Sequence, residues 1–185
     1  MSSSLTGRLL VAAPGMRDPN FARSVVLLLD HGDDGAFGVV INRPLEVDVD
    51  EVLPDWQPFA TPPGRLFQGG PVGLDGALGV VLVPDGSVPP PGVDRVTGPF
   101  GLVDLDTPTD EVASRLGELR VFAGHSGWSG GQLEAEIARG DWLVLAADER
   151  DPFSGSPERL WSQVLRRQGG DLALFAGAPV DPRLN

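Results

Sequence analysis

The chain has 185 residues, 26 acidic and 14 basic side chains, a formal charge of −12 at pH 7, and no cysteine. The absence of cysteine excludes disulfides and cysteine-ligated metals. All the basic residues are arginine, which excludes a Schiff-base lysine and a P-loop lysine. A chain of this length buries about 70% of its unfolded surface, so we expect residues 1–185 to form one domain.

The negative charge is spread along the chain, with 11 acidic residues and 5 arginines in residues 1–92 and 15 and 9 in residues 93–185. An evenly acidic surface repels nucleic-acid phosphates and anionic lipids, so it disfavours direct binding to nucleic acid or to a membrane. No apolar run approaches the ~20 residues that span a bilayer. The apolar run at residues 9–13 is too short for a secretion signal. We therefore expect a cytoplasmic protein.

Apolar β-rich runs dominate the first half of the chain. Residues 24–30 and 36–42 predict a hairpin with a five-residue turn between them. Both runs are apolar at almost every position, so both faces of these strands should be covered, most simply by helices. Further strands are predicted at residues 8–13, 66–68, 77–84 and 100–105. Prolines and glycines predict loops at residues 14–20, 57–64, 69–73 and 85–92, and a weak helical pattern covers residues 47–56.

The second half alternates between helices and strands. The run Thr107-Pro108-Thr109-Asp110 is typical of a helix start, with the threonine as the cap. Strands are predicted at residues 119–123 and 142–147. Helices are predicted at residues 132–139 and from Ser156-Pro157 to Gly169. Mixed helices and strands with an early hairpin indicate an α/β protein whose sheet is not purely parallel.

Residues 124–131 are the most suggestive stretch for function, between a predicted strand and a predicted helix. Residues 127–131 match G-x-S-x-G, the nucleophile elbow of serine hydrolases. However, Ser129 lies several residues beyond the predicted strand, and both histidines precede it, which reverses the hydrolase order. Ser129 and Gln132 also have the spacing of a capping box, which we favour for this serine.

Two other interpretations of residues 124–131 stay open. Backbone N–H groups of a glycine-rich turn at a helix N-terminus can bind an anion, although this spacing matches neither the Rossmann nor the P-loop motif. Alternatively, the glycines permit a tight turn and Trp128 fills the core. His125 could act as a base, but no carboxylate stands beside it at motif spacing.

The acidic turn at residues 30–35 has carboxylates at positions one and five and glycine at six, as an EF-hand loop does. Gly32 and Ile41 stand where two calcium ligands should be, so we favour an ordinary turn. We predict no metal site and no cofactor.

Three groups of residues together resemble the YqgE/AlgH family of bacterial proteins. They are residues 14–16, 18–21, 23–26, 31, 35–36, 38 and 42–44; residues 69–72; and residues 124–128, 131–134, 136 and 142. The resemblance extends over about residues 6–175 and implies an α/β fold of the α+β type. Its sheet would be mixed and largely antiparallel, with helices on both sides.

The resemblance also implies a cytosolic protein without a settled biochemical activity, and the label of transcriptional regulator attaches to the AlgH branch. The chain departs from the family pattern at His125, where an aromatic residue such as tyrosine is frequent. It also departs at Arg43, where lysine is common.

We therefore predict a protein that binds a small ligand or a protein partner and is not an enzyme, because its distinctive residues shape backbone and surface. The candidate ligand-binding residues are Asn42, Arg43, Gly124, His125, Ser126, Gly127, Trp128, Gly130 and Gly131. No catalytic residue is predicted. The alternative is a small hydrolase or an anion- or phosphate-binding enzyme that uses residues 124–131, with His125 as the base. If residues 42–44 and 124–131 line one cleft, a binding site there becomes the leading hypothesis.

Overall fold

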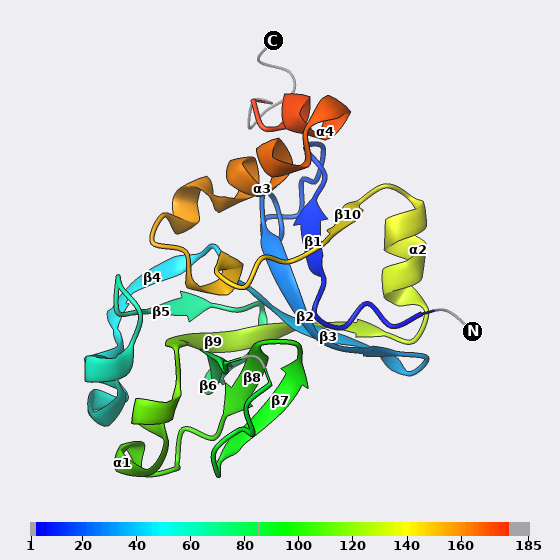
Figure 1. Ribbon diagram of the computed structural model, residues 1–185. Helices are drawn as coiled ribbons and strands as arrows, with labels where there is room; N and C mark the ends of the chain where they lie inside the picture. Colours follow the sequence, from blue (N-terminus) through cyan, green and yellow to red (C-terminus); the bar gives the residue numbers. More distant parts are fainter. Residues whose placement is uncertain (1–2, 85, 178–185) are drawn as a thin grey trace.

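The computed structural model describes residues 3–84 and 86–177, and Figure 1 shows a curled sheet with helices around it. Ten strands in these ranges form a sheet in the order β10-β1-β2-β3-β9-β6-β8-β7, with β5 on β9 and β4 on β5. The strands are β1 (Leu9–Ala12), β2 (Val25–Gly32), β3 (Gly35–Val40), β4 (Pro44–Asp48), β5 (Arg65–Gln68), β6 (Val72–Leu82), β7 (Val93–Thr97), β8 (Phe100–Val103), β9 (Glu118–Ser129) and β10 (Trp142–Leu145). The helices are α1 (Thr109–Val112), α2 (Gln132–Ala138), α3 (Leu160–Gln168) and α4 (Gly170–Phe175). Short 3₁₀ turns are η1 (Val49–Glu51), η2 (Pro54–Phe59), η3 (Ala113–Arg115), η4 (Asp151–Phe153) and η5 (Pro157–Arg159).

Antiparallel pairing dominates the sheet. Among the described strands only β5 and β9 run parallel, with Phe67 opposite Phe122. The first and last of the described strands are neighbours, because Leu9 of β1 pairs with Leu145 of β10. The mixed, largely antiparallel sheet confirms the fold class expected from the sequence.

Both faces of the central strands are covered, as the continuous apolar runs predicted. Leu27 of β2 packs in an apolar cluster that includes Trp161 of α3, whereas the next residue, Leu28, packs in a second cluster with Leu133 of α2. Because neighbouring residues of a strand point to opposite faces, α2 and α3 cover opposite sides of the sheet (Figure 1). A third cluster, which includes Trp56, lies under η2 and α1.

Several element boundaries differ from the prediction. The hairpin turn is two residues long, because β2 continues to Gly32 and pairs it with Gly35. The weak helical pattern at residues 47–56 begins as the end of β4 and continues as η1 and η2. The structure describes the predicted 85–92 loop from residue 86 onward. β7 follows this loop, although no strand was predicted there. The short helix α4 was also not predicted.

The predicted helix starts are only partly correct. The helix expected after Thr107 is the single turn α1, whose cap position is Pro108 and which has no side-chain cap. The last long helix begins with the 3₁₀ turn η5 and continues as α3, whose buried residues are Leu160, Trp161, Val164 and Leu165. Gly169 follows α3 at φ +72°, as a helix-ending glycine does.

The largest difference is β9, which contains most of the segment that was expected to be a glycine-rich loop. Residues 124–129 are strand because they have partners: Ser126–Ser129 pair with Gly35–Gly38 of β3, and His125 pairs with Val72 of β6. Backbone pairing here outweighs the weak strand preference of glycine.

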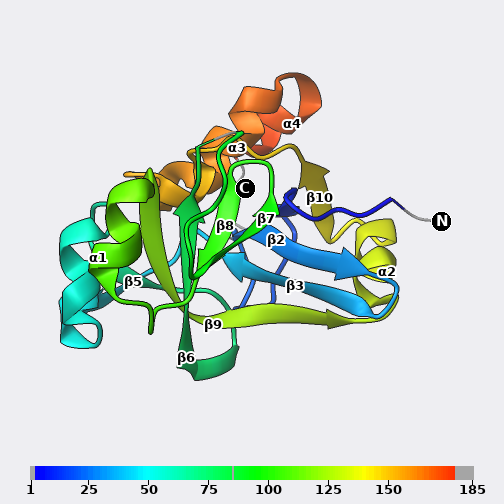
Figure 2. The same ribbon diagram turned by 60° about the horizontal axis from the view of Figure 1, so that its bottom comes forward.

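The start of β6 bends away from β9. Val72 pairs with His125 and Ala77 pairs with Ala123, so residues 73–76 stand opposite Gly124 alone. We call residues 73–76 the arch. Figure 2 shows the start of β6 projecting beyond β9 at the bottom of the view.

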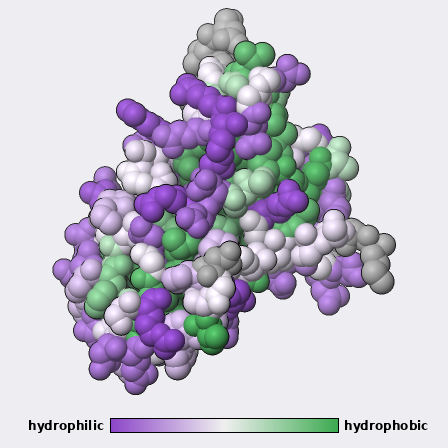
Figure 3. All heavy atoms as spheres, in the orientation of Figure 1, coloured by the Kyte–Doolittle hydropathy of each residue, from purple (hydrophilic) through white to green (hydrophobic). Residues whose placement is uncertain are grey.

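Hydrophilic side chains cover much of the face seen in Figure 3, including the region of α3, and apolar side chains show beside it over β1 and β10. None of the described helices is long and apolar enough to cross a membrane.

Candidate functional site

The three parts of the chain that carry the family resemblance come together at Gly69. This residue lies where β3 and β9 separate, and we call this point the fork. The backbone N–H of Gly69 donates to the carbonyl of Ala123 at 2.8 Å. The Gly69 carbonyl accepts from the backbone N–H of Val40 at 2.8 Å and from Oγ of Ser126 at 3.0 Å. Ser126 is fully buried. Its hydroxyl therefore holds the Gly69 carbonyl at the fork and is not available as a nucleophile.

Gly70, the next residue, is required at this fork by close packing. A Cβ atom there would overlap the carbonyl oxygen of His125 and Oγ of Ser126. Glycine at this position therefore lets two strands approach each other, which is a structural reason for the Gly69-Gly70 pair.

Asn42 fastens the start of β2 to the end of β3. Its side-chain Oδ1 accepts from the backbone N–H of Val25 at 3.0 Å, and its Nδ2 donates to the carbonyl of Arg23 at 2.9 Å. Both ends of the amide are therefore used within the fold. This use explains why asparagine, with a donor and an acceptor, stands here.

Arg43 binds the loop before β2. Its guanidinium donates to the carbonyls of Pro19 at 3.2 Å, of Asn20 and of Ala22 at 2.8 Å. Burial lowers the pKa of Arg43, and the charge of Asp18 opposes that shift. The guanidinium of Arg43 is thus occupied by backbone carbonyls of its own fold.

Trp128 belongs to the core on the α2 side. Its ring lies 6.1 Å from the ring of Phe21 and 6.0 Å from that of Trp142, measured between centroids. The indole N–H groups of Trp128 and Trp142 both donate to Oε1 of Glu136, at 3.2 and 3.1 Å. This arrangement matches the interpretation in which the tryptophan fills the core. Gly127, by contrast, is exposed on β9.

Ser129 hydrogen-bonds to the side chain of Gln132, but its own hydroxyl does not cap the helix as a serine cap would. The backbone N–H and Oγ of Ser129 both lie within hydrogen-bonding distance of Oε1 of Gln132, at 3.0 and 3.2 Å. The cap position of α2 is Gly131, at φ +81°, and no side chain caps the helix. Gly130 approaches the hairpin turn so closely that a Cβ would press on the Asp33 carbonyl, at 2.6 Å.

The hydrolase interpretation of this segment has no geometric basis in the described residues. His125 and Ser129 lie four residues apart on one strand, which separates their Cα atoms by about 13 Å. The imidazole of His125 makes no hydrogen bond or ion pair with any described side chain. A base must lie within hydrogen-bonding reach of its nucleophile.

His125 instead forms one wall of a pocket. The pocket has a volume of about 330 Å³ and lies between β3, β9 and the arch. Its lining residues are Phe37, Gly73, Asp75, Gly76, Ala77, Leu78, Gly124 and His125. Most of this lining is apolar, and Phe37 and Leu78 also pack against the main core cluster.

The geometry of the pocket depends on two glycines with positive φ. Gly124, at φ +73°, lies under the arch, and a Cβ there would lie 2.7 Å from the carbonyl oxygen of Gly70. Gly73, at φ +62°, is so close to the imidazole that its Cβ would lie 3.3 Å from Cε1 of His125. The ring of Phe37 stands 4.8 Å from the imidazole, centroid to centroid.

The structure therefore separates the candidate residues. Gly124 and His125 line the pocket, whereas Asn42, Arg43, Ser126 and Trp128 bind other parts of the fold. Sequence reasoning missed Phe37, the arch and Asp75, because only the register of β3, β9 and β6 brings them beside His125. The described residues contain no group of three or more His, Asp or Glu side chains placed to hold a metal.

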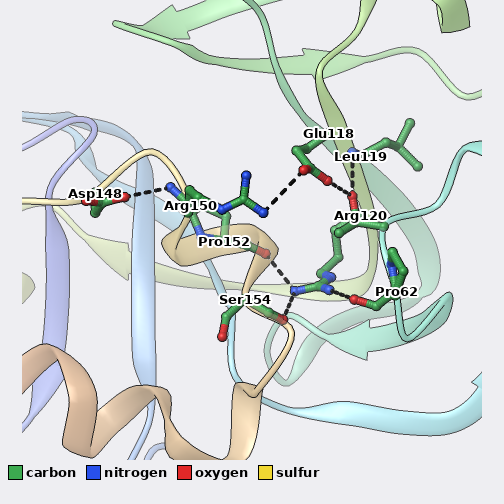
Figure 4. Close-up of polar contacts among 9 residues, drawn as sticks. Pro62, Glu118, Leu119, Arg120, Asp148, Arg150, Pro152 and Ser154 are labelled. Carbon is green, nitrogen blue, oxygen red and sulfur yellow. Dashed lines mark hydrogen bonds and ion pairs between the residues drawn. The ribbon is translucent and has the colours of Figure 1, made fainter.

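A second feature absent from the sequence predictions is the buried guanidinium of Arg120 on β9 (Figure 4). It donates to the carbonyls of Pro152 at 3.1 Å, Ser154 at 2.9 Å and Pro62 at 2.6 Å. It also lies 4.3 Å above the ring of Phe67. Burial lowers the pKa of Arg120 to about 10, which leaves it charged at neutral pH. Arg120 thus joins three segments of the fold.

The sequence matches the profile of AlgH-like proteins over residues 9–173. A UPF0301 protein of Streptomyces coelicolor is 56% identical in an alignment of 186 positions that covers 99% of this chain and 96% of that protein. A UPF0301 protein of Mycobacterium tuberculosis is 44% identical over 177 residues, which are 95% of this chain and 88% of that protein.

Two solved structures share the fold. A crystal structure of a protein from Corynebacterium diphtheriae is 34% identical, with a TM-score of 0.89 over 95% of this chain and 93% of that chain. The solution structure of the AlgH protein from Pseudomonas aeruginosa is 32% identical, with a TM-score of 0.69 over 97% of both chains.

Proposed function

The chain belongs to the AlgH-like family, and from this premise we propose that it acts by reversible binding of a small ligand beside His125 rather than by catalysis. One observation carries the proposal: a partly buried imidazole with no hydrogen bond to a described residue faces a largely apolar pocket of about 330 Å³. Pockets of this kind, with a few polar groups on apolar walls, are the usual form of small-molecule sites.

The chemistry of the lining favours binding over reaction. The imidazole and the Asp75 carboxylate line the pocket without forming an ion pair with each other. Ser126 uses its hydroxyl in the fork. A ligand can therefore hydrogen-bond to the two polar groups, whereas a hydrolytic step would need a nucleophile beside His125.

The proposal includes a regulatory role in the cytoplasm. Val72, beside the arch, and Leu74, in the arch, are 48% and 53% exposed. A ligand under the arch would press on these residues and change an apolar surface that a protein partner could contact. Direct contact with DNA forms no part of the proposal, because a net charge of −12 opposes it.

Binding can be tested by NMR at the histidine rings, because the chain has two histidines and each gives a separate Cε1–Hε1 signal. The probes are benzamidine, aniline, phenol and benzoate at millimolar concentration. At least one probe should shift the His125 signal in a saturable way and leave the His31 signal in place. If all four leave His125 unchanged, the pocket is not a ligand site.

Catalysis is tested separately with p-nitrophenyl acetate and p-nitrophenyl phosphate. We expect the same slow hydrolysis from the wild-type protein and from the His125→Ala and Ser129→Ala variants. Turnover that either substitution abolishes would show that the chain is an enzyme and would overturn the proposal.

A further inference from the structure

The charges around the His125 pocket indicate what kind of ligand it can hold. Asp75, on the arch, is the one charged residue in the lining, and no arginine contributes to it. The chain has no lysine. A ligand in this pocket therefore meets a carboxylate and an imidazole, within a protein of net charge −12.

These groups disfavour phosphate and carboxylate ligands. An anion in a protein site is held by arginine, lysine or converging backbone N–H groups. The anion cradle considered for residues 124–131 would need a free turn, but residues 125–129 are paired strand. Among the described residues the pocket lining therefore contains no arginine or lysine, and the paired residues 125–129 offer it no free turn.

The shape of the pocket favours a flat group. The rings of Phe37 and His125 stand 4.8 Å apart with 51° between their planes, so they form an angled aromatic wall. Opposite the imidazole, Gly73 has no side chain, and a Cβ there would already touch the ring at 3.3 Å from Cε1. Aromatic faces attract flat rings, and the faces of Phe attract cations.

We propose, on the basis of the function proposed above, that the pocket binds a flat nitrogenous cation, an amine or amidine attached to a ring. The ring lies against Phe37 and His125. The cationic nitrogen points to the Asp75 carboxylate at the arch, and an N–H of the ligand donates to the imidazole. The walls supplied by Ala77 and Leu78 exclude water from the ring.

Benzamidine and benzoate test this inference as a matched pair, because they have nearly the same size and shape but opposite charge. Each is titrated into the full-length protein, and the Cε1–Hε1 signal of His125 is followed by NMR. The signal of His31 serves as an internal reference, because its side chain is 3% exposed and both its ring nitrogens are hydrogen-bonded. A ligand of about nine non-hydrogen atoms should bind with a Kd in the millimolar range.

The expected result is a saturable shift of His125 with benzamidine and at least a tenfold weaker response to benzoate, where tenfold is an order-of-magnitude estimate for reversing one charge. Asp75→Asn should weaken benzamidine binding about two- to fivefold, the range typical of an exposed ion pair. The matched control is Asp171→Asn on α4, an exposed carboxylate outside the pocket, which should leave the affinity unchanged. His125→Phe keeps a ring but removes both nitrogens, and it should also weaken binding. The amide signals of Val72 and of the arch then report the titration.

Three outcomes decide between the two proposals. Benzamidine binding that depends on Asp75 supports the cationic ligand. Benzoate binding at His125 with equal or higher affinity overturns the cationic ligand but leaves the pocket as a ligand site. No response to benzamidine, in a protein whose amide spectrum shows that it is folded, overturns the cationic ligand, and no response to any of the four probes overturns both proposals.

Discussion

His31 and Glu134 are 103 residues apart in the sequence, yet Nε2 of His31 lies 2.6 Å from Oε1 of Glu134. The other ring nitrogen, Nδ1, accepts from the backbone N–H of Leu5 at 2.9 Å. Because an N–H group can only donate, Nδ1 carries no proton in this arrangement, and Nε2 donates to the carboxylate. One imidazole therefore joins the N-terminal segment, the hairpin and α2.

The His31–Glu134 bond makes stability depend on pH. The hydrogen bond from His31 holds the pKa of Glu134 below its ordinary value. A carboxyl group whose pKa is lowered by folding stabilises the protein above its unfolded pKa, about 4.3, and loses that contribution as the pH falls through the folded value. Because the Glu134 side chain is 43% exposed, Glu134→Gln should lower the free energy of unfolding by only about 0.5–1 kcal/mol at pH 7.

Urea denaturation between pH 7 and pH 3 measures this effect. The difference between the wild-type protein and Glu134→Gln should shrink as the pH falls below the unfolded pKa. Glu149→Gln, at an exposed carboxylate without a described partner, is the control and should show no such trend. An equal deficit at all pH values would contradict the assignment.

Arg120→Met should be strongly destabilising. The methionine replaces the buried stem but leaves the carbonyls of Pro62, Pro152 and Ser154 without their donor, at a total cost of about 3 kcal/mol in the free energy of unfolding. Urea denaturation gives the value. Arg150→Gln, which removes a guanidinium from a side chain that is 65% exposed, should cost less than about 1 kcal/mol. Similar losses for the two variants would show that the buried contacts of Arg120 contribute little.

Gly70→Ala should destabilise the protein by more than about 2 kcal/mol, because the new Cβ overlaps the His125 carbonyl and one of the two strands must move. Gly15→Ala is the matched substitution, since a Cβ there meets no atom within 4 Å. Its effect should stay within about 0.5 kcal/mol. Thermal unfolding of the two variants compares them directly, and an unaltered Tm for Gly70→Ala would refute the packing argument.

Asn42→Ala separates a role in the fold from a role in binding. The substitution removes two hydrogen bonds to the start of β2 and should lower the free energy of unfolding by about 1–2 kcal/mol. Its affinity for benzamidine should match that of the wild-type protein at a temperature where both are folded. Reduced affinity in the folded variant would place Asn42 in the ligand site.

The early hairpin, the coverage of both faces of the sheet and the C-terminal end of α3 could be predicted from sequence, because each depends on neighbouring residues. The continuous apolar run in β2 predicts that both faces of the strand are buried, and Gly169 predicts the end of a helix. The 124–131 segment could not be assigned in this way. Its glycines favour a loop when taken alone, and only pairing with β3 and β6 makes residues 124–129 a strand.

The candidate site was partly predictable for the same reason. His125 and Gly124 stood out by residue type. Their surroundings depend on an arch of four residues opposite one, which no local pattern specifies. Asn42 and Arg43 also stood out, but a polar side chain that binds its own backbone has the same sequence signature as one that binds a ligand.

During synthesis, β1 must wait for β10 before one of its edges can be paired. Leu9 cannot meet Leu145 until the ribosome has made the residues between them, which takes on the order of ten seconds in bacteria. Until then, β1 has an open edge on the side that β10 will occupy. Such an edge can pair with another chain. The nascent chain is therefore most exposed to aggregation, and to capture by chaperones, during the interval that ends when β10 has been synthesised.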